Sequence, residues 1–384
     1  MAALIADVLP RLRELDIVLA STSPRRAEIL RAMGLPFTQR APPFEEALEH
    51  RRFASPAHYV AANAWGKALS ILAEPAEPAE HGEKTGRGTV IVASDTVVAL
   101  HLDDVASGQG GEAATAGPTT RGISADAAAA PATASAAAGA DDAAPAATAA
   151  AGAEDAATSA SWMEGFPMCG LARSAEAGGG SDAHRGAWVV LEKPGSADRA
   201  VEMLKALRGK SHFVFTAVAV AFRGQGSDGA SLAEESLAAA ATALGLGERL
   251  PGWEGASSAG PGLCLGTTTV PAAVMEGSPA AHTTVAAAGG AGGGGSAGGA
   301  GCCVCVQSSR VEFVNFSDAA AEAYAAGGEP LDKAGGYAVQ GAGGSLVRSL
   351  EGDFHAVMGL PMALTAAMLR PAAAQAGGRG CGGE

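Results

Sequence analysis

The chain has 384 residues, of which 48% are hydrophobic, and it carries a formal net charge of −14. This acidic balance argues against a nucleic-acid-binding domain, which usually presents a basic face. No stretch of about 18 or more strongly apolar residues predicts a membrane span, and the N-terminus lacks the pattern of a signal peptide, so we expect a cytoplasmic location.

Two low-complexity blocks interrupt the sequence, at residues 103–186 and 224–301. Both are rich in Ala and Gly, which bury too little apolar surface to offset the entropy of ordering the chain. We therefore expect disordered insertions, with a short helix within 234–243; the pattern does not separate true insertions from mispredicted exons. The six cysteines have no metal-ligand spacing and lie in Gly/Ala-rich surroundings, which predicts free thiols in flexible segments.

The remaining pieces make up one domain-sized sequence in which strand and helix patterns alternate. These pieces are 1–102, 187–223 and 302–370, followed by a flexible tail, 371–384. We expect strands at 16–20, 89–93, 187–191, 211–222, 310–316, 336–340 and 346–350. We expect helices at 24–33, 56–72, 196–207 and 318–326. The alternation predicts an α/β fold, with helices on the faces of a sheet.

The first candidate site is the turn after the first strand, Ser21-Thr22-Ser23-Pro24-Arg25-Arg26. A helix start offers free backbone N–H groups, and the two arginines add permanent charge, so the segment suits a phosphate. A capped helix with two solvent-facing arginines also fits these residues.

Carboxylates mark the next two candidates. Glu45 and Glu46 follow a proline turn in an extended segment, so one of them can face a given site, where a carboxylate suits Mg²⁺ or Mn²⁺. Asp95 follows the strand at 89–93, at the kind of strand end where open α/β sheets bind ligands, and it could bind a metal or accept a proton from water. An acidic surface pair and a turn residue are the alternatives.

The last candidate is the Gly-rich stretch from Leu331 to Gly341, in which Gln340 can both donate to and accept from a base edge. A Gly-rich turn leading into a strand also fits this stretch. Two lysines complete the set: Lys67 on the long helix and Lys193 directly after a strand. Each of them, taken alone, fits a surface lysine.

The order of these clusters is more informative than any one of them. Outside the two blocks, the sequence resembles the Maf family from about Ile17 to about Leu369. The matching pieces are LASTSPRRAEILRAMGLPF, the Glu45-Glu46 pair, Lys67, IVASDTVV, LEKP, AVEMLKALRGKSHFVFTAVAV, EPLDKAGGYAVQGAGG and LEGDFHAVMGLP. The combination of S-x-S-P-R-R near one end with D-K-A-G-x-Y-x-x-Q-G near the other is a specific signature.

The resemblance implies a mixed sheet flanked by helices and a nucleoside triphosphate pyrophosphatase, a homodimer that uses Mg²⁺ or Mn²⁺ and releases a nucleoside monophosphate and pyrophosphate. Phosphate contacts are implied for Ser21, Arg25, Lys67 and Lys193. Glu46 and Asp95 match metal-linked residues, and Asp95 also matches the aspartate that activates the attacking water. The positions tied to pyrimidine choice, in a version similar to the dTTP and UTP branch, are Arg26, Thr96 and Gln340.

Three other functions stay open on the sequence: a pyrophosphatase that prefers modified bases, a non-catalytic nucleotide-binding regulator of cell division, and an interaction protein that recruits partners through the two blocks. Catalysis is favoured because a pure binder has no need of a water-activating aspartate. The first block separates Leu100 from Val189, where the family joins two strands by a tight turn, and a long loop there costs little closure entropy.

Overall fold

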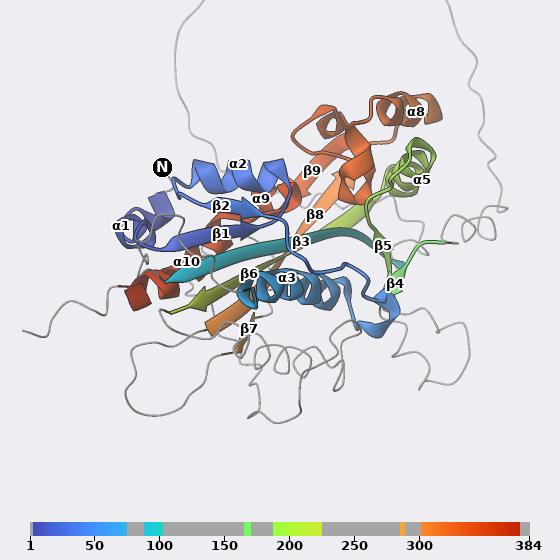
Figure 1. Cartoon of the computed structure of the whole chain (residues 1–384). Helices are drawn as coiled ribbons and strands as arrows, with labels where there is room; N and C mark the ends of the chain where they lie inside the picture. Colours follow the sequence, from blue (N-terminus) through green and yellow to red (C-terminus); the bar gives the residue numbers. More distant parts are fainter. Residues whose placement is uncertain are drawn as a thin grey trace, which may run out of the picture.

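In the computed structural model, the described residues are 3–74, 88–102, 165–169, 187–224, 285–288 and 301–376. Within them, nine strands form one mixed sheet with helices on both faces (Figure 1). The strands are β1 (Asp16–Ala20), β2 (Thr38–Arg40), β3 (Thr89–His101), β4 (Met168–Cys169), β5 (Trp188–Leu191), β6 (Ser211–Arg223), β7 (Val285–Ala288), β8 (Gly301–Phe313) and β9 (Val347–Glu351). The α-helices are α1 (Leu9–Leu12), α2 (Pro24–Ala32), α3 (Pro56–Leu72), α5 (Ala197–Leu207), α8 (Asp318–Ala326), α9 (Phe354–Met358) and α10 (Met362–Ala376). Short 3-10 turns are η1 (Ala3–Ile5), η2 (His50–Arg52), η5 (Glu329–Asp332), η6 (Ala334–Gly336) and η7 (Ala342–Leu346).

The strand β3 organises the sheet because it pairs along both edges. On one edge it runs antiparallel to β6 from Thr89 to Ala99. On the other edge, its first half pairs in parallel with β1, ending with Ala20 opposite Ala93, and its second half pairs antiparallel with β5, beginning with Leu191 opposite Val98. The segment 94–97 therefore lies between the ends of β1 and β5, where the loops that follow those strands diverge. A reversal of this kind is where open α/β sheets bind ligands.

The rest of the sheet extends outward from this centre in the order β2-β1-β3-β6-β8-β7, with β9 also pairing with β8. Strand β2 is parallel to β1, whereas β8 and β9 continue the antiparallel half. The sheet is therefore parallel at one side and antiparallel at the other, and this confirms the predicted mixed α/β fold.

Three apolar clusters hold the layers together. Helix α3 covers one face, where its Trp65 is 1% exposed, a degree of burial that contributes about 1.5–3 kcal/mol for a large apolar side chain. Helices α1, α2 and α10 cover the other face, and an ion pair between Arg370 and Asp7 joins the two ends of the described chain. A third cluster packs α5 and the C-terminal turns against the second half of β3. The described chain has no helix long and apolar enough to cross a membrane.

Most predicted elements are confirmed to within two residues, but β3 and β8 are much longer than predicted. Asp95 consequently lies inside a strand of 13 residues, not after its end, because β6 continues to pair with β3 beyond Ala93. Strand β8 begins at Gly301, not at 310, and ends at Phe313.

The predicted strand at 336–340 is wrong. Gly335 and Gly336 have φ values of +71° and +70°, a left-handed conformation that a strand does not use, and they form the turn η6 instead. A Cβ atom on Gly335 would lie 2.7 Å from Val98 Cγ2, so the turn also depends on the absence of a side chain.

Described elements extend into the two predicted blocks and the predicted tail. Strand β4 belongs to the first block and β7 to the second, and both pair with the sheet. Three cysteines predicted in flexible segments have side chains in strands, namely Cys169, Cys303 and Cys305. Helix α10 extends to Ala376, past the predicted start of the tail at 371. The predicted helix within 234–243 lies outside the described residues, as do Cys264 and Cys381.

Candidate active site

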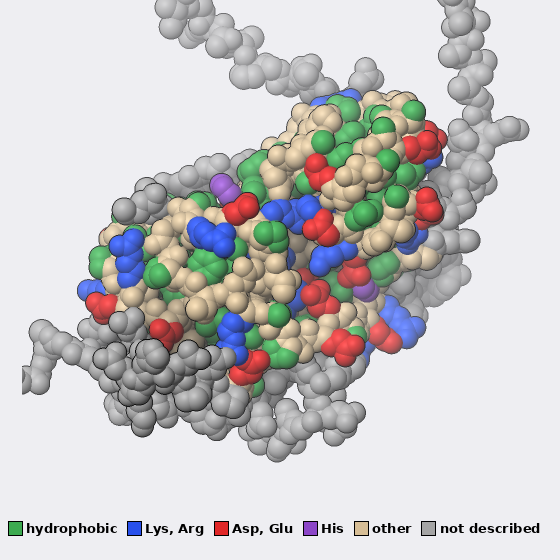
Figure 2. Space-filling view, turned by 45° about the horizontal axis from the view of Figure 1, so that its top comes forward, with side chains coloured by type: hydrophobic (Ala, Val, Ile, Leu, Met, Phe, Trp, Pro, Cys, Tyr) green, Lys and Arg blue, Asp and Glu red, His purple; other side chains and the backbone are tan. Residues whose placement is uncertain are grey.

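A cavity of about 510 Å³ opens where β1 and β5 leave the edge of β3. Its wall includes the loop after β1, the start of α2, the middle of β3, the loop after β5 and the turn at 332–334. Figure 2 shows a hollow in this face, bordered by Lys and Arg side chains and by Asp and Glu side chains. Eight of the nine predicted site residues line the cavity: Ser21, Arg25, Arg26, Glu46, Lys67, Asp95, Thr96 and Lys193. The ninth, Gln340, lies on an exposed turn and is not part of the lining.

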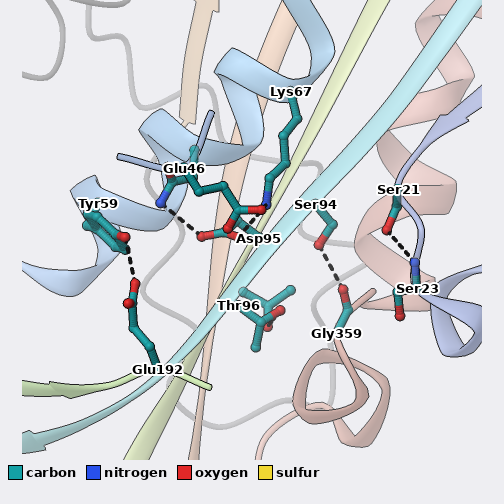
Figure 3. A network of polar contacts seen from close by, with 12 residues as sticks. Ser21, Ser23, Glu46, Tyr59, Lys67, Ser94, Asp95, Thr96, Glu192 and Gly359 are labelled. Atoms are coloured by element: carbon teal, nitrogen blue, oxygen red, sulfur yellow. Dashed lines mark hydrogen bonds and ion pairs between the residues drawn. The ribbon is translucent and has the colours of Figure 1, made fainter. Parts of the chain in front are cut away.

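Lys67 is the electrostatic centre of this cavity. It is 4% exposed, and its Nζ lies 2.7 Å from Asp95 Oδ1 and 2.9 Å from Glu46 Oε1 (Figure 3). The three residues come from different elements: α3 carries Lys67, β3 carries Asp95, and Glu46 lies on the segment between β2 and α3. One ammonium group thus joins two carboxylates that are far apart in the sequence.

Asp95 is held by a second donor as well. Asn63 Nδ2 donates to Asp95 Oδ2 at 3.2 Å, one helical turn before Lys67. Burial raises the pKa of Asp95, but Lys67, Arg26 and the Asn63 hydrogen bond together lower it below its usual value. Asp95 is therefore a carboxylate at neutral pH, although it is 6% exposed.

Arg26 connects three walls of the cavity. Its Nε donates to the carbonyl of Gly359 at 3.0 Å, and its two terminal nitrogens donate to Ser21 Oγ and Thr96 Oγ1, each at 3.3 Å. Burial lowers the pKa of Arg26, and the charges of Asp95 and Glu46 oppose that shift. All three guanidinium nitrogens are engaged, so Arg26 positions Ser21 and Thr96 as well as supplying charge.

The Thr96 hydroxyl is oriented by this arrangement. Its oxygen lies 3.0 Å from Thr216 Oγ1, which itself lies 2.7 Å from the carbonyl of Ala356. A carbonyl only accepts, so the single hydroxyl hydrogen of Thr216 goes to Ala356, and Thr96 then donates to Thr216. The chain of donors runs from Arg26 through Thr96 and Thr216 to the carbonyl.

Two residues predicted to contact phosphate, Arg25 and Lys193, line the cavity but are not held there by an ion pair with any described residue. Arg25, at the start of α2, is half-buried, and burial lowers its pKa while Asp332 and Glu28 oppose that effect. Lys193 is exposed on the loop after β5. Among the described carboxylates, none lies within 4 Å of either side-chain cation, so both are available to an anion.

A cluster that the sequence did not predict supports the loop of Lys193. Glu192 Oε1 accepts from Tyr59 OH at 2.7 Å and contacts His50 Nε2 at 3.0 Å, and the rings of His50 and Tyr59 stack at 4.0 Å. Burial raises the pKa of Glu192, but the hydrogen bonds from His50 and Tyr59 lower it overall. This cluster joins η2, α3 and the loop after β5.

The missed residues Tyr59 and Asn63 had a detectable signal. They precede Lys67 by eight and four residues on the predicted helix 56–72, and residues four apart share one helix face. Had Lys67 been used to choose the functional face of that helix, the other two would have been identified with it.

The fold and the cavity together define a mixed α/β protein whose cationic and acidic side chains meet at a strand-direction switch. The family model described as "Maf-like protein" matches residues 16–117, 124–240 and 275–372. The chain belongs to this family.

Individual relatives match over a shorter stretch. A dTTP/UTP pyrophosphatase of Neisseria meningitidis serogroup B is 51% identical over 65 residues, which are 17% of this chain and 32% of the relative. A dTTP/UTP pyrophosphatase of Anaeromyxobacter dehalogenans (strain 2CP-C) is 49% identical over 67 residues, and a nucleoside triphosphate pyrophosphatase of Haemophilus ducreyi is 48% identical over 66, each covering 17% of this chain and 34% of the relative. The chain thus spans about a third of the length of the relatives it matches.

Proposed function

We propose that this protein hydrolyses nucleoside triphosphates, with dTTP and UTP as the first candidates, to a nucleoside monophosphate and pyrophosphate. The observation that carries the proposal is the cavity itself, in which Lys67 joins Glu46 and Asp95 while Arg25 and Lys193 remain available. The names of the relatives support the reaction and the two substrates. A homodimer is part of the proposal and is supported by the family resemblance, whereas the cytoplasmic location stays a prediction from the sequence.

The cations of the cavity fit the binding of a triphosphate. Arg25 offers a planar fork of donors that suits phosphate oxygens, and Lys193 adds a mobile point charge. The backbone N–H groups at the start of α2 add a partial positive charge beside Ser21. Phosphoryl chemistry depends on this kind of charge neutralisation and positioning more than on covalent catalysis.

The donor set also fits Mg²⁺ or Mn²⁺. Within the part of the chain that the structure describes, no cluster of three or more His, Cys, Asp or Glu side chains could hold a metal ion. Glu46 and Asp95 provide two carboxylates, and Mg²⁺ is commonly bound by one or two carboxylates together with substrate phosphates. These two residues would hold the ion, which would polarise the α-phosphate and lower the pKa of water.

Asp95 would then act as the general base. It accepts a proton from water, the water oxygen bonds to the α-phosphorus, and the bond from that phosphorus to the bridging oxygen breaks. A carboxylate is a weak base, and a divalent ion held beside it would supply water of lower pKa. Arg25, Lys67 and Lys193 stabilise the negative charge that develops on the departing pyrophosphate.

The test is pyrophosphate release from dTTP, UTP, CTP, ATP, GTP and a set of modified-base triphosphates, with Mg²⁺ or Mn²⁺. We expect release from dTTP and UTP, and a loss of about 10²-fold or more in Asp95→Asn, the range of general-base effects. Asp318→Asn is the matched control, because this aspartate lies on α8 and pairs with Lys205 and Arg208 outside the cavity.

Three outcomes decide between the functions. Loss in Asp95→Asn and not in Asp318→Asn supports the site. Faster release from a modified triphosphate keeps the reaction and changes the substrate. No release from any triphosphate by the folded protein refutes the enzyme and favours a nucleotide-binding regulator.

A further inference from the structure

Helix α3 presents three donors to the cavity carboxylates from a single face. Tyr59 donates to Glu192, Asn63 donates to Asp95, and Lys67 pairs with Asp95 and Glu46. The three follow one another at four-residue spacing, which places them on one stripe of the helix. Figure 3 shows the Tyr59 and Lys67 ends of this stripe, with Asp95 beside Lys67. Asn63 is the central member, and it is not among the residues that line the cavity.

Asn63 is unfavourable for the fold by itself. It is fully buried, and its Oδ1 has no hydrogen-bond partner among the described residues. Turning the amide over does not remove the problem, because the carboxylate of Asp95 only accepts and must face the amide nitrogen. Leu at this position would remove the unpaired amide oxygen, but it would also remove the donor to Asp95 Oδ2.

The contact with Asp95 supplies a reason for the amide. The two carboxylate oxygens of Asp95 have different partners: Oδ1 meets Lys67 at 2.7 Å, and Oδ2 accepts from Asn63 at 3.2 Å. A carboxylate rotates easily about its last side-chain bond, which has broad torsional preferences, so one contact does not define its plane. A triphosphate in the cavity competes for the Lys67 ammonium, and the Asn63 contact lies on the other oxygen.

We propose that Asn63 is a positioning residue, which holds the Asp95 carboxylate in the plane needed for proton transfer while Lys67 is engaged with phosphate. The inference rests on the proposed function, since it concerns the same reaction. The amide remains bonded to Oδ2 when Lys67 turns away, and Oδ1 then faces the cavity. Because the amide nitrogen of Asn63 must face Asp95, its amide oxygen Oδ1 remains buried and unpaired among the described residues.

The test compares Asn63→Leu with the wild-type protein and with Ser70→Ala, all as the full chain with Mg²⁺. Ser70 is a control on the same helix, whose hydroxyl bonds to the carbonyl of Lys67. We expect Asn63→Leu to stay folded, with a modestly lower melting temperature because Asp95 loses a donor, and to lose at least tenfold in kcat with KM changed less than threefold. Misplacement of a catalytic group by about 1 Å can cost about 10²-fold, so the loss is measurable. Asn63→Ala repeats the measurement without a larger side chain, in case Leu does not fit.

The outcomes separate this inference from the proposed function. If the wild-type protein releases pyrophosphate and Asn63→Leu does so with unchanged kcat, the positioning role is overturned and the proposed function stands. A variant that loses thermal stability and worsens in kcat and KM together indicates a packing role, which also overturns it. No release by the wild-type protein overturns both.

Discussion

Replacing Lys67 by Met keeps the length of the side chain and removes the charge that joins Asp95 to Glu46. The two contacts of Lys67 are not equivalent, because the Asp95 side chain is 8% exposed and that of Glu46 is 48% exposed. Water therefore screens the pair with Glu46, which contributes about 0–1 kcal/mol. The pair with Asp95 is buried, so it dominates the effect of the substitution.

The expected magnitude follows from that geometry. Two unit charges 2.7 Å apart attract by about 6 kcal/mol at an effective dielectric constant of about 20, and the cost of burying both charges opposes this attraction. Removing one partner of a buried pair destabilises a protein by about 3–5 kcal/mol. We expect Lys67→Met to lower the free energy of unfolding by this amount, and Glu46→Gln to lower it by less than about 1 kcal/mol.

The effect depends on pH. Although burial raises the pKa of Asp95, the neighbouring cations lower it overall, so the ionised carboxylate stabilises the wild-type fold above its unfolded pKa of about 3.9. That contribution is lost as the pH falls through the lower, folded pKa. Without Lys67, the burial of Asp95 is less well compensated and its pKa rises. The destabilisation by Lys67→Met should therefore be largest near neutral pH and shrink as the pH is lowered toward about 4.

The assay is equilibrium unfolding by urea at several pH values, with a chelator present to remove divalent ions. The control is the double variant Lys67→Met/Asp95→Asn, in which neither member of the Lys67–Asp95 pair is left charged and alone, so most of the lost stability should return. A cost below about 1 kcal/mol at neutral pH, or no recovery in the double variant, would refute the assignment of a buried ion pair.

Three further perturbations test the surroundings of the site. In Gly66→Ala the new Cβ would overlap the ring of Phe44, so the ring must move, and we expect Glu46, two residues later, to move with it. The variant should need several-fold more Mg²⁺ with little change in melting temperature. An unchanged Mg²⁺ titration would contradict this. Tyr59→Phe removes a donor to Glu192, whose side chain is 44% exposed, so the loss should be about 0.5–1 kcal/mol. Because the folded pKa of Glu192 is depressed, the difference in unfolding free energy between wild type and Tyr59→Phe should appear at neutral pH and fade below about pH 4. A loss of stability that does not depend on pH would show that the hydrogen bond to the ionised Glu192 is not its cause. Burial raises the pKa of the Cys169, Cys303 and Cys305 thiols to about 12, about 11 and about 12, respectively. These thiols in the native protein at pH 8 should therefore resist iodoacetamide, whereas those of the denatured protein should react, as read by mass spectrometry at each site. Alkylation in the native state would contradict the buried placement of Cys169 and Cys305 and the partly buried placement of Cys303.

The sequence by itself determined the local elements and the composition of most of the cavity. Helix α2 begins at Pro24 and ends at Ala32, shortly before the left-handed Gly34, because the fixed φ of proline and the left-handed turn of glycine are local properties of the chain. The order of short motifs was enough to identify eight residues that line one cavity. Ser21 and Lys193 follow the ends of β1 and β5, and loops that follow such strand ends meet where the strand direction switches.

Only the tertiary structure decided how those residues bond to one another. Asp95 proved to lie inside a strand because β6 pairs beyond the apolar run that defined the predicted strand end. The carbonyl of Gly359 accepts from Ser94 and Arg26 across 265 and 333 residues, and Asn63 reaches Asp95 from another element. Gln340 belongs to the signature and yet lies on an exposed turn. Such placements depend on how helices and turns pack on the sheet, and residues close in sequence contain little of that information.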